Sequence, residues 1–177
     1  MKNFFRKVAF GINPYEEVPS DPLNWALNQV DNVPEFSWKG KIPTEKELRG
    51  HYRDWVYGDR EVLRKKYKND KKLYKVNKDL LRHDTGQKFW ASLEIAIRHN
   101  EAINSNNPVL AKLWMFWGNF FAISEKDFLA NYSTGPYHRE IIRPNLNQTF
   151  EKMVYDVTTS WAMIHHLDNS ESAGPKS

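Results

Sequence analysis

The chain has 177 residues, of which 40% are hydrophobic and 27% are charged, a balance typical of a globular domain rather than a disordered chain. It contains no cysteine, which excludes disulfides, thiolate nucleophiles and thiolate metal sites. The formal net charge of +4 is unevenly spread: residues 60–82 hold ten Lys or Arg and three Asp or Glu, a local balance of +7, so the rest sums to −3.

The sequence predicts neither a signal peptide nor a transmembrane segment. Arg6 and Lys7 interrupt the short apolar run near the N-terminus, and no small-residue cleavage site follows it. No stretch approaches the roughly 20 apolar residues that cross a bilayer. Composition alone assigns no compartment.

The first helix signal lies at Asp21, an N-cap candidate followed by Pro22, whose fixed φ suits a first helical turn. Apolar residues in the segment 23–30 recur at helical spacing, and Pro34 ends the pattern. Residues 32–43 are expected to form a loop with aromatic anchors.

The second signal is the pair Thr44 and Glu47, which matches a capping box. In this motif the hydroxyl and the carboxylate satisfy each other's free backbone N–H groups. We expect a helix from here through Trp55, weakened at Gly58. Residues 59–82 continue with apolar side chains at roughly helical intervals and charged residues at most other positions.

Two further helices are predicted in the middle of the chain. Residues 84–86 (Asp-Thr-Gly) indicate a break before a helix that carries Phe89 and Trp90. Asn107 and Pro108 repeat the cap-then-proline signal and open residues 109–117, which are apolar on most sides and therefore predict a buried helix.

The last part of the chain is expected to begin with a long loop over residues 124–138, where small polar residues, glycine and proline are frequent. A short helix over residues 139–145 would be interrupted by Pro144, and residues 149–167 predict a final amphipathic helix. Because no segment alternates with a period of two, we expect an all-α fold, an irregular multi-helix domain with long polar loops.

Three stretches carry a resemblance to a known family. The first is an arginine-rich opening that ends in phenylalanine-glycine (residues 6–11), and the second is an aromatic segment (residues 116–124). The third and most specific runs from the arginine-proline element at residues 139–144 to the leucine-aspartate-asparagine turn at residues 167–169 and the glycine-proline pair beyond it. Together they resemble the bacterial family called domain of unknown function 1800, which has no settled activity.

The resemblance also has departures. The family typically has histidine where this chain has Phe120, and often histidine where it has Asn145, so an acid–base or metal role does not transfer to either position. The family domain continues past the glycine-proline turn into a motif rich in asparagine, glutamate and arginine. The resemblance therefore implies that residues 1–177 are the N-terminal portion of a single helical domain, truncated on its C-terminal side.

Six polar residues form a candidate site: Asn119, Arg139, Glu140, Arg143, Asp168 and Asn169. Arginine's donor fork suits a carboxylate or a phosphate, on a ligand or on another helix, and we favour a buried ion-pair network. Asn119 lies in an apolar helix and is expected to be buried and to bond the backbone of a neighbouring loop, or else to line a pocket. Asp168 and Asn169 are typical of a helix-end turn, with a ligand role as the alternative.

His165 and His166 stand beside Asp168, but adjacent helical residues point about 100° apart and cannot easily share one ion. We expect no metal and no cofactor.

We therefore expect an uncharacterised scaffold or interaction portion that packs against the C-terminal part of its own domain or against a partner protein. One alternative is part of an enzyme, such as a hydrolase, whose other site residues lie beyond Ser177. Another is polyanion binding through residues 60–82, although nucleic acid is not the expected partner because no helix-turn-helix, zinc or RNA-binding signature accompanies the charge.

Overall fold

A computed structural model describes residues 2–12, 15–84, 87–124, 129–169, 172 and 174. All regular structure within these ranges is helical, which confirms the all-α prediction. In the same ranges no helix has both the length and the apolar character needed to cross a membrane.

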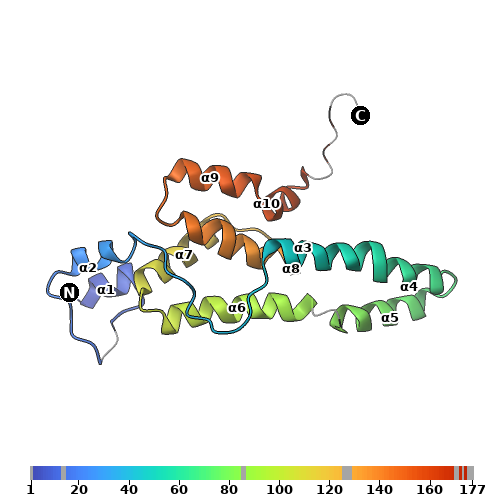
Figure 1. The fold of residues 1–177 in the computed structure, drawn as a ribbon, viewed down its shortest axis with the longest axis horizontal. Helices are drawn as coiled ribbons and strands as arrows, with labels where there is room; N and C mark the ends of the chain where they lie inside the picture. The colour runs from blue at the N-terminus through green and yellow to red at the C-terminus, as the bar shows by residue number, and fades with distance from the viewer. Residues whose placement is uncertain are drawn as a thin grey trace.

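The molecule is elongated because two pairs of consecutive helices run along its length (Figure 1). Helix α3 (Glu45–Asp54) passes through a π-helical turn, η1 (Trp55–Asp59), into α4 (Arg60–Lys66). The chain then reverses, and α5 (Lys71–Asp84) and α6 (Gln87–Asn104) run back beneath them. Helices α4 and α5 form an arm at one end of the molecule, and α1 (Lys2–Val8) and α2 (Pro22–Asn28) lie at the other.

The second half of the chain covers α6. Helix α7 (Pro108–Phe120) is followed by α8 (Ala130–Pro136), which runs directly into the π-helix η2 (Tyr137–Ile142) and the 3-10 turn η3 (Arg143–Asn145). Helices α9 (Phe150–Thr159) and α10 (Trp161–His166) lie above this segment, and α6 packs beneath it.

The main hydrophobic core lies where these layers meet. Its buried members come from α6, α7, η2, α9 and α10, and they include the large side chains of Trp114, Tyr137 and Val157. Burial of such large side chains contributes about 1.5–3 kcal/mol each, so the core fixes η2 against α6 and α7.

Several predicted helix starts are confirmed. Thr44 and Glu47 form the complete capping box, with Glu47 accepting from the Thr44 backbone N–H at 2.8 Å. Asp21 caps α2 through the backbone N–H of Asn24, and α7 begins at Pro108 as expected.

Two predicted continuous helices are broken. The run over residues 59–82 reverses after α4, because Tyr67 leaves the helical conformation and Asp70 caps the first turn of α5 by accepting from the Leu73 backbone N–H at 2.9 Å. The predicted helix over residues 149–167 is interrupted at Ser160, whose ψ of 148° is extended and whose hydroxyl caps α10.

The prediction of a long loop over residues 124–138 is wrong for its second half, where α8 and the start of η2 are helical and buried. The small residues that indicated a loop instead allow close packing: a Cβ at Gly135 would overlap the side chain of Glu94 on α6. The predicted break at residues 84–86 includes Thr85 and Gly86, which lie outside the described residues.

Candidate functional site

Arg139 and Arg143 lie one helical turn apart on η2 and η3, and both contact α6. Glu140, next to Arg139, is exposed. The two arginines are only 5% and 6% exposed, and each is matched by a buried glutamate of α6. Burying a charge costs much free energy unless the charge is paired and hydrogen-bonded, so the two arginines and two glutamates form one network of mutually compensating charges.

The first pair joins Arg139 to Glu94. The Arg139 Nε lies 2.8 Å from Glu94 Oε1 and 3.0 Å from Oε2, and Nη2 donates to the backbone oxygen of Pro43 at 2.6 Å. Glu140 lies nearby and accepts from the backbone N–H of Glu45 at 2.8 Å. These bonds attach the start of α3 to η2.

The second pair joins Arg143 to Glu101, with Nη2 3.7 Å from Oε2. The Arg143 guanidinium also lies over the ring of Phe36, 4.1 Å from its centroid, which is a cation–π contact. Glu101 accepts from the backbone N–H of Ser37 at 2.6 Å, so the predicted loop over residues 32–43 is held to α6 by this carboxylate.

The electrostatics follow from burial. Burial raises the pKa of Glu94, and the charge of Arg139 offsets part of that rise. Burial likewise lowers the pKa of Arg143, against the opposing effect of Glu101.

His138, next to Arg139, is 7% exposed, and its pKa is lowered to about 3 by burial and by the charge of Arg98. It is therefore neutral near pH 7. Its Nδ1 has no hydrogen-bond partner among the described residues, and it packs against Gly118.

The other predicted site residues lie elsewhere. Asn119 is exposed at the end of α7, so the prediction that it is buried is wrong. Asp168 and Asn169 are exposed beyond the end of α10, and Asp168 has a φ of +55°, the left-handed conformation of a helix-end turn. His166 accepts from the backbone N–H of Ser124 at 3.1 Å, a structural contact.

Glu94 and Glu101 were not predicted, although the sequence contains a signal for them. They are seven residues apart, two helical turns, and therefore lie on one face of a helix that is otherwise rich in apolar residues. Two charges on the apolar face of a helix indicate buried partners of opposite sign, which Arg139 and Arg143 provide.

A shallow surface depression of about 760 Å³ borders the network, and Arg143 lines it together with Phe36, Trp38 and Asn147. The Arg143 Nη2 has no hydrogen-bond partner within the described residues. This depression is where the network approaches solvent.

The described residues form an all-α protein in which two buried arginine–glutamate pairs join η2 and η3 to α6. The chain belongs to the family described as "Protein of unknown function (DUF1800)", whose model matches residues 3–177. No curated protein and no solved structure matches it.

Proposed function

We propose that this chain is a helical scaffold that docks an apolar protein surface through an aromatic cluster on α7 and α9. The cluster is defined by five rings, Phe116, Trp117, Phe120, Phe121 and Phe150. Three of them are more than half exposed: Phe116 by 55%, Phe120 by 61% and Phe150 by 57%.

The rings form a continuous surface. Phe116 and Phe120 are stacked with centroids 6.3 Å apart, Trp117 and Phe121 are stacked at 5.7 Å, and Phe150 joins Trp117 at 5.7 Å. Contiguous exposed apolar area of this kind marks interaction surfaces, and aromatic residues are enriched in them. Residues 113–120 contain no charged side chain, so an apolar partner suits this surface better than a charged one.

The buried network supports a scaffold role. The Arg139 guanidinium already contacts Glu94, Glu140 and the backbone of Pro43, so its donors are occupied by the protein itself. Phe120 stands where the resemblance to the family implies histidine, and this replaces a titratable ring with part of the aromatic cluster.

As occupant of the cluster we propose the C-terminal part of the family domain, beyond its glycine-proline turn. The test adds that part of a full-length family member to this chain in trans and measures the affinity by calorimetry. Phe116→Ser combined with Phe120→Ser is expected to weaken binding at least tenfold.

The matched control is Tyr155→Ser, which removes an aromatic side chain that is 67% exposed on α9 but outside the cluster, and it should leave affinity within twofold. Equal affinity of the double variant and the native chain would contradict the proposed surface. Turnover of a substrate by the isolated chain would contradict the scaffold role.

The depression beside Arg143 favours a second candidate, a ligand-binding site at Arg143 that further residues of a full-length family domain would complete. Of the other predicted site residues, Arg139 is occupied by Glu94 and Pro43, and Asp168 and Asn169 lie elsewhere in the fold. Its support is that Arg143 lines the depression, and that its Nη2 makes an ion pair with Glu101 at 3.7 Å but no hydrogen bond within the described residues. A guanidinium suits a carboxylate or phosphate oxygen. Arg143→Lys keeps the charge but removes the donor fork, so any activity measured for a full-length relative should fall at least tenfold. Unchanged activity would eliminate this candidate.

A further inference from the structure

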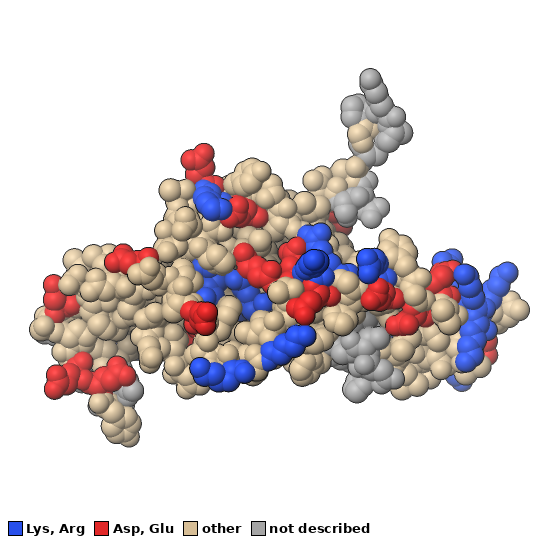
Figure 2. All heavy atoms as spheres, viewed as in Figure 1, with Lys and Arg blue, Asp and Glu red and all other residues tan. Residues whose placement is uncertain are grey.

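The arm formed by α4 and α5 concentrates the positive charge of the chain. Figure 2 shows Lys and Arg gathered at that end of the molecule. The chain reversal at Tyr67 brings the basic residues of α4 next to those of α5, which a single continuous helix would have kept apart.

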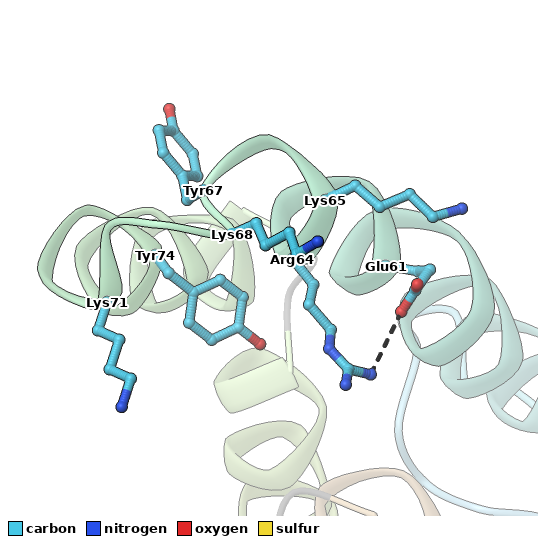
Figure 3. A pocket seen from close by; sticks show the side chains of 7 residues that line it. All are labelled: Glu61, Arg64, Lys65, Tyr67, Lys68, Lys71 and Tyr74. Carbon is cyan, nitrogen blue, oxygen red and sulfur yellow. Dashed lines mark ion pairs between the residues drawn. The ribbon is translucent and has the colours of Figure 1, made fainter.

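Between the two helices lies a pocket of about 580 Å³ (Figure 3). Four basic side chains line it, Arg64, Lys65, Lys68 and Lys71. Glu61 is the one carboxylate among its lining residues, and it lies 3.8 Å from Arg64. Within the part of the chain that the structure describes, the three lysines have no ion-pair partner, so the pocket keeps an excess of positive charge.

Two tyrosines complete the pocket. Tyr74 lies across the cleft between the helices with its hydroxyl toward Arg64, while Tyr67 points outward from the turn (Figure 3). Both rings are half-buried and therefore held in place by the protein. A basic groove combined with fixed aromatic rings is the arrangement that binds single-stranded nucleic acid, with phosphates on the cations and bases on the rings.

We propose that the arm binds single-stranded nucleic acid without sequence preference, through this pocket. The positive charge extends beyond the pocket along α5, where Lys72, Lys75 and Lys78 follow. A helix of this length spans about 21 Å, which suits a chain of phosphates better than a single anion. The helix-turn-helix, zinc and RNA-binding signatures that the sequence lacks belong to proteins that recognise base sequence. They are not required for binding the phosphate backbone of a nucleic acid.

A lipid surface is the rival occupant, because α5 also exposes Leu73, Val76 and Leu80 by 48%, 50% and 60%. Lys71 and Tyr74, which line the pocket, lie on the opposite side of α5 from this apolar stripe at 100° per residue. A flat bilayer in contact with the stripe would leave the concave pocket empty. The pocket therefore favours a flexible strand.

The test measures fluorescence anisotropy of a labelled 20-nucleotide oligothymidine with the full chain at 50 mM and 200 mM salt. Four phosphate contacts give a salt slope near −2.8, so affinity is expected to fall roughly fifty-fold between these concentrations. Arg64→Gln with Lys68→Gln should weaken binding at least tenfold at 50 mM salt and reduce the magnitude of the slope by about 1.4. Tyr67→Leu with Tyr74→Leu should weaken binding without changing the slope.

The matched control is Lys39→Gln with Lys46→Gln, which removes the same charge from exposed positions off the arm and should change affinity less than twofold. Far-UV circular dichroism checks the fold, and Lys65→Gln with Lys71→Gln replaces the first pair if that variant unfolds. Two results would each overturn the proposal. One is no oligothymidine binding at 50 mM salt, with binding to phosphatidylserine vesicles or heparin then identifying the rival occupant; the other is equal losses in the arm and control variants.

Discussion

The side chains of Arg139 and Glu94 form a buried ion pair, 2.8 Å from Nε to Oε1, between residues 45 positions apart in the sequence. The pair joins the π-helix η2 to α6, and Arg139 also donates to the backbone oxygen of Pro43. A single guanidinium therefore links α6, η2 and the start of α3.

Arg139→Met should lower the free energy of unfolding by about 3–5 kcal/mol, because it leaves Glu94 buried without its charge partner. The double variant, with Glu94→Met added, should recover at least half of this loss, since it removes both charges and fills the space with apolar atoms. Urea denaturation followed by circular dichroism measures all three proteins. A loss below about 1 kcal/mol in the single variant would show that the pair contributes little.

Gly135→Ala should destabilise the protein by about 1–3 kcal/mol, because the added Cβ overlaps the carboxylate arm of Glu94 and forces α8 away from α6. Gly50→Ala is the control, since a Cβ at Gly50 in α3 meets no atom within 4 Å and should stabilise the helix by about 0.5–1 kcal/mol. Thermal unfolding compares the two alanine variants. Equal melting temperatures would show that the close contact at Gly135 is unimportant.

His138 makes stability depend on pH in the acidic range. Its pKa is about 3 in the folded protein, against an ordinary value of 6.5, so the unfolded chain takes up the proton first as the pH falls. Stability should therefore decrease as the pH falls from 6.5 toward 3, by at most about 1.4 kcal/mol per pH unit for one proton. His138→Asn cannot titrate and should have a flatter profile between pH 6.5 and 4.5, and parallel profiles for the two proteins would contradict this assignment.

Thr44→Ala should cost about 1 kcal/mol, because it removes the hydroxyl that accepts from the Glu47 backbone N–H at the start of α3. Bonds from Thr44 lower the pKa of Glu47 to about 2, so the capping contribution is present above its usual pKa of 4.5 and is lost as the pH falls toward 2. Glu47→Gln should remove that acid-dependent loss. Denaturation series at pH 3 and pH 6 measure both effects.

Local signals in the sequence predicted the helix starts at Asp21 and Thr44, because a cap bonds a residue three positions further on. The start at Pro108 follows from proline's fixed φ, since Asn107 makes no side-chain cap bond. The helix α8 could not be predicted in this way. Its small polar residues disfavour a helix by propensity, and only the close approach of Glu94 to Gly135 from another layer explains why they are there.

The candidate site was likewise only partly predictable from the sequence. The spacing of Arg139 and Arg143 indicated a network, but the sequence does not link these arginines to their partners. The acceptors are Glu94 and Glu101 of α6 and the backbone oxygen of Pro43, and Ser37 donates to Glu101 from the neighbouring loop. Asn119 was expected to be buried because its helix is apolar on most sides, yet the end of α7 is exposed, and the same exposure creates the aromatic cluster. The apolar sequence therefore predicted the buried first part of α7 correctly, including Trp114, but not the exposed surface at its end.

The continuous helix formed by α3, η1 and α4 also has a mechanical consequence. It is roughly 33 Å long at 1.5 Å per residue, and its base is fastened by Arg139 at Pro43 and by Glu140 at Glu45. A force applied at the far end of α4 therefore acts on the hydrogen bonds of 2.6 Å and 2.8 Å at the base of α3. A rotation of this helix would load those bonds together with the packing of α3 against α8, so the basic end of the molecule is mechanically connected to the buried Arg139.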